Sequence, residues 1–113
     1  MKRVYDEPSE KDGNRILVDG LWPRGLRKEK ARIDYWAKDV APSAELRKWF
    51  NHDPEKWNKF KNLYYKELVS KSNCIDKLLK IIGSRESTFL FSSREPRFNN
   101  AVALREFLLS NQK

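Results

Sequence analysis

Two short runs with apolar centres, near opposite ends of the chain, constrain its fold more than any other feature. Residues 15–19 form the first run, which stops at Gly20, and residues 88–92 form the second, which a polar stretch interrupts. Both runs are short and bounded by turn residues, so both predict buried strands. Helical patterns separate them, and parallel strands joined across helices need a crossover connection, which is right-handed when the strands are neighbours.

Four helical patterns lie between the two runs or after the second one. Ser43 is a favourable N-cap for the first helix, and Pro54 suits the first position of the second. Asn73 starts the third helix, which ends at Gly83, and apolar residues return at helical spacing over 101–108. We therefore expect the α/β fold class, in the form of a small layered domain with a short, mostly parallel sheet flanked by about four helices.

Three further segments lie outside these helices and buried strands. Residues 3–5 alternate in polarity and predict a first strand, and residues 7–14 predict a loop rich in turn residues. The segment 33–40 predicts either a third strand or an irregular stretch.

The composition predicts a single folded domain over residues 1–113. This length is typical of one domain, and 39% hydrophobic residues, with 12% aromatic ones, can supply a core. No window approaches the roughly 20 apolar residues of a membrane span, and the start of the chain lacks the apolar region of a signal peptide. The lone cysteine, Cys74, agrees with a reducing compartment. We expect a cytoplasmic protein with no membrane partner, and the sequence leaves its oligomeric state open.

The chain is strongly basic, with 24 Lys and Arg against 16 Asp and Glu and a formal net charge of +8. A surface of this charge attracts polyanions and anionic metabolites. A solvated basic surface without a specific ligand is the alternative interpretation.

Two loops that follow the predicted strands indicate where a ligand would bind. If the strands 15–19 and 88–92 are parallel, their carboxyl ends share one edge of the sheet, where open α/β folds leave a crevice. Loops 19–28 and 92–100 would then meet there. The candidate ligand-binding residues in these loops are Asp19, Trp22, Arg24, Lys28, Ser92, Ser93, Arg94, Asn99 and Asn100.

The chemistry of these loops favours a small anionic ligand. Arginine offers a fork of donors that matches phosphate or carboxylate, and the free backbone N–H groups at a helix start favour the same charge. The structural alternative is that Trp22 fills the core, that Pro23 and Gly25 form a turn, and that the Ser and Asn residues cap a helix.

A set of motifs spread over nearly the whole chain points to a known family. The motifs are Arg3–Asp6, Asp12–Gly13, Arg15–Asp19, Leu21–Gly25, Ala41–Ser43 with Glu45–Lys48, and Asn99 before Ala101–Leu104. They resemble the YeaO-like branch of the domain-of-unknown-function 488 family, and the Leu-Trp-Pro-Arg-Gly turn is a specific signal. The resemblance implies a compact α/β domain with a site near this turn and the last strand, in a family without a settled activity.

The chain departs from the pattern of that family at two positions. The family usually has Arg where this chain has Gly20, and His where this chain has Asn100. If the family's site uses that His as a proton carrier, this chain lacks the group or uses another. The resemblance therefore implies a site and leaves the catalytic residues unknown.

The remaining reactive residues predict neither a catalytic nor a metal site. His52 is the only histidine and lies beside Asp53 at a helix junction, where we expect it to be structural or exposed and away from both loops. Cys74 would lie in the first turn of a helix capped by Asn73, and lone cysteines are usually inert. One His and one Cys make no credible metal cluster, and no Gly-rich nucleotide motif is present. We expect no cofactor and no metal.

The second functional hypothesis is nucleic-acid binding through the basic segment 24–32. A basic stretch flanked by aromatic residues can hold phosphates while it stacks bases. The residues concerned are Arg24, Arg27, Lys28, Lys30 and Arg32, with Trp22 and Trp36 near the two ends. The segment lacks the recognised nucleic-acid-binding motifs, and a protein-interaction or structural role is the third hypothesis.

Overall fold

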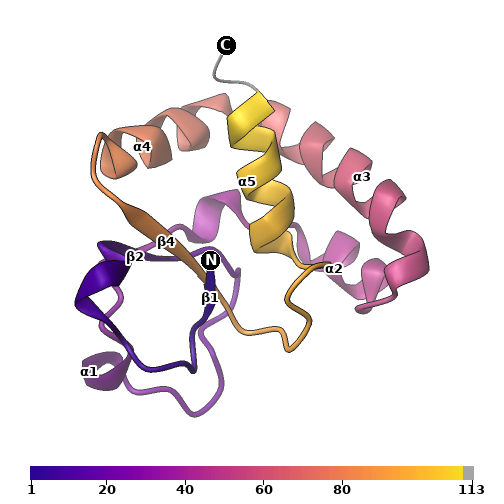
Figure 1. Cartoon of the computed structure of the whole chain (residues 1–113). Helices are drawn as coiled ribbons and strands as arrows, with labels where there is room; N and C mark the ends of the chain where they lie inside the picture. Colours follow the sequence, from indigo (N-terminus) through magenta and orange to yellow (C-terminus); the bar gives the residue numbers. More distant parts are fainter. Residues whose placement is uncertain (111–113) are drawn as a thin grey trace.

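Four short strands form one parallel sheet in the computed structural model, which describes residues 1–110. The strands are β1 (Lys2–Arg3), β2 (Asn14–Leu17), β3 (Tyr35–Trp36) and β4 (Ser87–Phe91). Their order across the sheet is β1-β4-β2-β3, and every neighbouring pair is parallel. The two predicted buried strands are therefore confirmed, and they pair directly as β2 and β4 (Figure 1).

Within residues 1–110 the chain forms five α-helices and three short 3-10 turns. The helices are α1 (Lys28–Ala31), α2 (Ala44–Phe50), α3 (Trp57–Val69), α4 (Ser72–Ile82) and α5 (Asn100–Ser110), and the turns are Glu10–Asp12, Lys38–Val40 and Pro54–Lys56. Helices α2 to α5 correspond to the four predicted ones, whereas α1 is a single turn in the basic segment, where the sequence predicts no helix. None of the helices in this part of the chain is both long and apolar enough to cross a bilayer.

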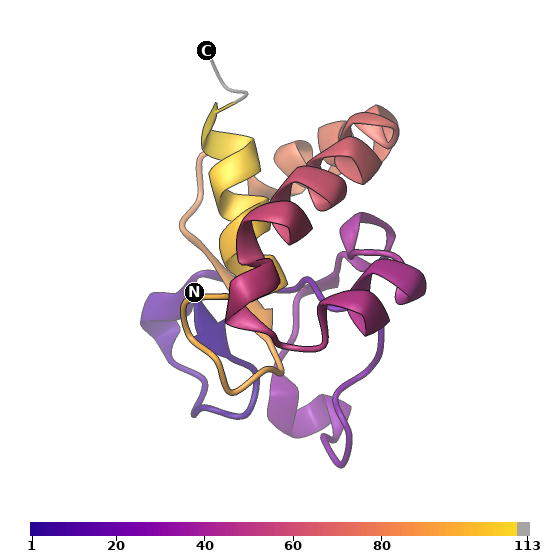
Figure 2. The ribbon, with the colours of Figure 1, turned by 90° about the vertical axis from the view of Figure 1, so that its right-hand side faces the viewer.

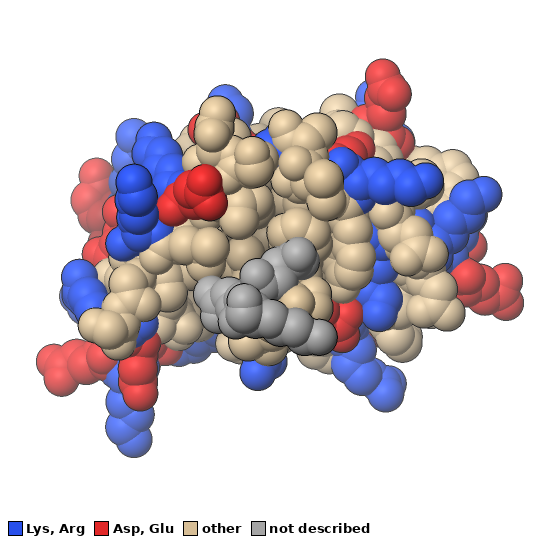
Figure 3. Space-filling view, turned by 90° about the horizontal axis from the view of Figure 1, so that it is seen from above, with Lys and Arg blue, Asp and Glu red and all other residues tan. Residues whose placement is uncertain are grey.

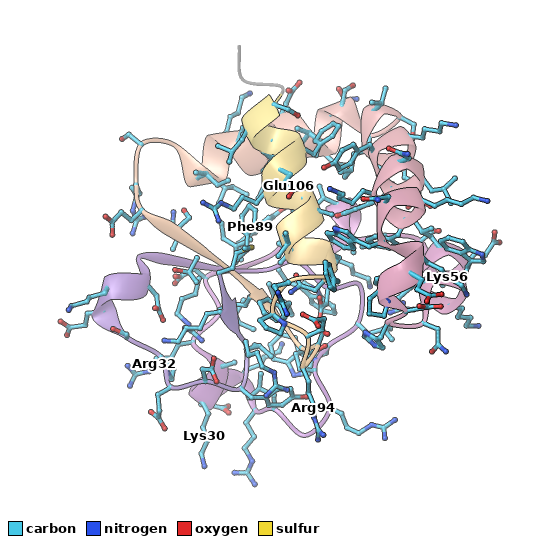
Figure 4. The ribbon with its side chains drawn as sticks, turned by 45° about the vertical axis from the view of Figure 1, so that its right-hand side comes forward. Lys30, Arg32, Lys56, Phe89, Arg94 and Glu106 are labelled. Carbon is cyan, nitrogen blue, oxygen red and sulfur yellow. The ribbon has the colours of Figure 1, made fainter. Side chains whose placement is uncertain are left out.

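The sheet separates two apolar layers of different size. Successive side chains of a strand point to opposite faces, so Ile16 and Phe89 join the larger core while Leu17 and Leu90 join a smaller one that includes Trp22. Helices α3, α4 and α5 cover the first face, and α1 lies on the other side of the sheet (Figures 1 and 2). Figure 4 shows Phe89 on the side of the sheet that faces α5.

The start of α2 is capped as the sequence predicts. The Ser43 hydroxyl oxygen accepts a hydrogen bond from the backbone N–H of Leu46 at 3.1 Å. Ser43 also donates from its backbone N and its hydroxyl to the Glu67 carboxylate in α3, at 2.9 and 2.6 Å. These bonds tie α2 to α3 and thereby fix α2 beside the edge of the sheet.

The start of α4 differs from the prediction. The helix begins at Ser72, so Asn73 lies inside its first turn, and the preceding residue, Lys71, makes no side-chain cap. The predicted capping role of Asn73 is wrong because only Ser70 and Lys71 separate α3 from α4. The backbone turn between them, closed by the Lys71 N–H on the Leu68 carbonyl at 2.9 Å, leads directly into α4.

The first strand is also displaced from its predicted position. β1 ends at Arg3, because the Asp6 N–H donates to the Arg3 carbonyl at 3.0 Å and turns the chain. The Val4 N–H still donates to the Phe91 carbonyl at 2.8 Å, so the pairing with β4 extends one residue beyond the strand. The segment 33–40 forms the two-residue strand β3 and then a 3-10 turn.

Candidate functional site

A pocket of about 440 Å³ opens at the carboxyl ends of β2 and β4. Because these strands are parallel neighbours, the loops that follow them meet at one edge of the sheet, as the sequence predicts. Most of the predicted ligand-binding residues line this pocket. They are Asp19, Trp22, Arg24, Ser92, Ser93, Asn99 and Asn100.

Two of the predicted residues stay outside the pocket. Lys28 begins α1, where its side chain is exposed on the other side of the sheet. Arg94 is exposed on the loop after β4. Figure 4 shows Arg94, Lys30 and Arg32 at the outer edge of the molecule. Neither Lys28 nor Arg94 is among the lining residues.

Asp19 is the best anchored polar group of the pocket. Its Oδ2 accepts hydrogen bonds from the backbone N–H and the hydroxyl of Ser92, at 2.9 and 2.7 Å. Its Oδ1 accepts one from Asn100 Nδ2 at 3.1 Å, and the same nitrogen donates to the Val18 carbonyl at 3.0 Å. The carboxylate therefore links the ends of β2 and β4 to the start of α5.

Asn99 and Ser93 serve the backbone of the loop. The Asn99 Oδ1 accepts from the Val102 N–H at 3.0 Å and caps α5, while its Nδ2 donates to the Glu95 carbonyl at 2.7 Å. The Ser93 hydroxyl accepts from the Glu95 N–H at 3.0 Å, and the Ser93 carbonyl accepts from Arg3 Nε at 2.9 Å. The structural alternative thus describes Asn99 and Ser93 well, although both also line the pocket.

Trp22 likewise has a packing role. Its ring meets that of Trp36 edge-on, with 5.5 Å between the centroids, and its Nε1 donates to the Leu26 carbonyl at 2.7 Å. The ring is half-buried and packs against the smaller core. Trp22 therefore holds the 21–25 turn in place and forms part of the pocket wall.

Arg47 is a pocket residue that the sequence analysis missed. It lies in α2, half-buried, and lines the pocket together with Phe50 of the same helix. Residues three apart share a face of a helix, so the spacing of Arg47 from Phe50 is the sequence signal that could have found it. Within residues 1–110, its guanidinium has neither a hydrogen-bond nor an ion-pair partner.

His52 also lines the pocket, so the expectation that it lies away from both loops is wrong. The residues Asn51 and His52 have left-handed backbones, with φ of 46° and 56°. This reversal ends α2 and turns the chain back beside the sheet edge, which places His52 next to the loop residues. Its side chain is exposed.

The rest of the wall is largely apolar. The remaining lining residues are Tyr5, Gly20, Leu21, Pro23, Pro42, Phe50 and Phe60. The Tyr5 hydroxyl donates to the Arg24 carbonyl at 2.9 Å and so steadies the turn that carries Arg24. The pocket combines two arginines and one histidine with a carboxylate and apolar walls, and can hold a small molecule of mixed polarity.

No group of three or more His, Cys, Asp or Glu side chains in the part of the chain that the structure describes could hold a metal ion. Cys74 is half-buried and is not a lining residue of the pocket. The chain departs from the family pattern at two positions, Gly20 and Asn100. Both of these residues line the pocket.

Comparison with known proteins gives a consistent result. A family model described as the inactive DUF488-N3 subclade matches residues 1–113. An uncharacterized protein of Mycobacterium tuberculosis is 40% identical over 106 residues, which cover 94% of this chain and 89% of that protein. The uncharacterized protein YeaO of Escherichia coli is 38% identical over 109 residues, which cover 96% and 95%. No solved structure matches the chain. The resemblance noted in the sequence is thereby confirmed, and the chain belongs to the YeaO-like DUF488 family.

Proposed function

We propose that the pocket binds a small ligand that carries a phosphate or carboxylate group. The observation that carries this proposal is Arg47, a half-buried residue that lines the pocket and whose guanidinium has no partner within residues 1–110. Removing a charge from water without a partner is unfavourable, and an oxyanion would supply that partner. The planar guanidinium fork suits the bidentate geometry of phosphate and carboxylate.

Arg24 and His52 support the same proposal. Both side chains are exposed, and both residues line the pocket. Arg24 lies on a turn that Tyr5 holds through its backbone carbonyl, so the guanidinium projects from a fixed base. Together with Arg47, Arg24 gives the pocket a positive bias, in a chain whose net charge is already +8.

The proposal concerns binding and assigns no catalytic step. Position 100 holds an amide, which does not exchange a proton near neutral pH as an imidazole does. The family model that matches the chain is described as an inactive subclade, which supports binding without turnover.

The absence of a second cysteine supports a cytoplasmic location, which is part of the same proposal.

Calorimetric titration with inorganic phosphate and 4-ethylphenyl phosphate tests the proposal. A hydrogen bond to a charged group contributes about 1.5–3 kcal/mol, so Arg47→Gln should weaken the binding of 4-ethylphenyl phosphate about tenfold or more. The matched control is Lys48→Gln, because Lys48 is the next residue of α2 and is exposed outside the pocket. Equal weakening by the two variants would show general charge attraction instead of a site.

Nucleic-acid binding is the second candidate, and one observation favours it. All five cations of the basic segment are exposed: Arg24, Arg27, Lys28, Lys30 and Arg32. The stacking half of that hypothesis is weaker, because Trp22 and Trp36 pack edge-on against each other and each donates its indole N–H to a backbone carbonyl. Figure 3 views the face over α3, α4 and α5, which lies opposite to α1; outside the grey atoms it shows uncharged residues between charges of both signs, so this face offers no uniformly basic surface.

A further inference from the structure

We propose that the ligand of this pocket is zwitterionic, with an ammonium group that Asp19 and Asn100 recognise and an anionic group that Arg47 recognises. This inference rests on the proposed function and adds the second half of the ligand. It starts from the observation that opposite charges line the pocket without pairing with each other. Asp19, Arg24 and Arg47 line it, and within residues 1–110 none of them forms an ion pair.

The hydrogen bonds of Asn100 fix which of its atoms remains free. Both hydrogens of Nδ2 are engaged, one by the Val18 carbonyl at 3.0 Å and one by Asp19 Oδ1 at 3.1 Å. The reversed amide would set its carbonyl oxygen against two acceptors, so the hydrogen-bond network determines the orientation. Within residues 1–110, the Asn100 Oδ1 is therefore an acceptor without a donor, on a residue that lines the pocket.

The contacts of Asp19 lead to the same requirement. Three donors reach its carboxylate, two from Ser92 and one from Asn100. A carboxylate offers about four lone-pair sites, so one remains, and within residues 1–110 no cation forms an ion pair with it. A negative group of a ligand would be repelled by Asp19, whereas an ammonium group would satisfy both Asp19 and Asn100.

The apolar walls indicate what joins the two ends of the ligand. Leu21, Phe50 and Phe60 line the same pocket as the polar groups, so the body of the ligand is apolar or carries a ring. The volume of about 440 Å³ admits a molecule of the size of a substituted aryl phosphate. The geometry thus describes one class of ligand, a small amine-bearing phosphate or carboxylate with an apolar middle.

Asp19 has a structural use as well, since its bonds tie β2 to β4 and α5, and the test must separate the two roles. Two probes with the same shape do so: 4-(aminomethyl)phenyl phosphate and 4-ethylphenyl phosphate differ in an ammonium against a methyl group. The wild-type protein should bind the amine about tenfold more tightly, the gain expected from one charge-assisted hydrogen bond. The N-acetylated amine, which keeps an N–H but loses the charge, should lose most of this preference.

Asp19→Asn should reduce the preference for the amine to about twofold or less. The same variant should bind 4-ethylphenyl phosphate as before or more tightly, because the negative charge of Asp19 is removed. A thermal melt shows whether this variant is folded. A second measurement needs no variant. The backbone amide chemical shifts of the wild-type protein are compared between its complexes with the two probes, and the differences should be largest at Asp19, Ser92 and Asn100.

The outcomes distinguish this inference from the proposed function. If neither probe binds, the proposed anion site itself is wrong. If both bind equally and depend on Arg47, the anion site stands and the zwitterionic ligand is refuted. A preference for the amine that persists in folded Asp19→Asn, or NMR differences centred elsewhere, would refute the assignment of the ammonium to Asp19.

Discussion

The buried ion pair between Asp12 and Arg15 gives the most quantitative prediction. The Arg15 guanidinium contacts the Asp12 carboxylate and donates to the carbonyls of Ala31 and Arg32 at 2.9 to 3.2 Å, with its side chain only 5% exposed. Asp12→Asn leaves this charge buried with carbonyl partners alone. Breaking a buried pair in this way costs about 3–5 kcal/mol. Since Lys2 also contacts Asp12, at 3.3 Å from a partly exposed position, and Asn retains one acceptor oxygen, we expect about 3 kcal/mol.

The pKa of Asp12 gives this prediction a pH dependence. Burial by itself would raise the pKa of the carboxyl, but the hydrogen bonds from the Ser9 backbone, Arg15 and Lys2 outweigh it and hold the pKa below its ordinary value of 3.8. A carboxyl whose pKa is lower in the folded than in the unfolded state stabilises the protein above the unfolded pKa, and this contribution is lost as the pH falls through the folded value. The cost of Asp12→Asn should therefore be full at pH 7 and shrink below about pH 4.

Urea denaturation of the wild type and Asp12→Asn at pH 7 and pH 3 measures both effects. The matched control is Asp6→Asn, because Asp6 is exposed and has no ion pair within residues 1–110. A loss below about 1 kcal/mol at pH 7, the size expected for an exposed pair, would refute the reasoning. So would a difference between the two proteins that is the same at both pH values.

Three further predictions concern the pocket, the turns and the alternative function. In thermal melts, Arg24→Ala should leave the stability nearly unchanged, because Arg24 is exposed. Trp22→Ala should lower the free energy of unfolding by about 2–3 kcal/mol, because the ring contact with Trp36 is lost. Equally large losses in the two variants would show that Arg24 has a structural role. In urea denaturation, Gly25→Ala should lower the free energy of unfolding by about 1 kcal/mol, because Gly25 has a left-handed backbone. Gly13→Ala should lower it clearly more, because the added Cβ would lie 2.1 Å from the Glu86 carbonyl oxygen, and similar costs for the two variants would contradict this reasoning. Titration with labelled oligonucleotides should show only non-specific binding weaker than about micromolar at physiological salt. Tight binding that survives added salt and is lost when segment 24–32 is neutralised would favour the nucleic-acid hypothesis.

The sequence alone predicted the part of the fold that local patterns determine. Two apolar runs with helical periodicities between them require a crossover, and parallel neighbours at their ends bring the loops after residues 19 and 92 to one edge. Ser43 and Gly83 mark helix ends through contacts within a few residues, so their roles were predictable as well. The loop half of the pocket follows from these local rules.

Only the tertiary structure decided what completes the pocket. Arg47 and His52 reach it because α2 is tied to α3 through Ser43 and Glu67 and then reverses through two left-handed residues. The spacing of Arg47 from Phe50 predicts a shared helix face, but no local pattern predicts that this face meets the pocket. The separation of Lys28 from the pocket has the same origin, since the single turn α1 packs on the opposite side of the sheet. Local periodicity specifies elements and the loops that directly follow them, whereas the approach of side chains from different elements depends on long-range packing, which a single sequence does not display.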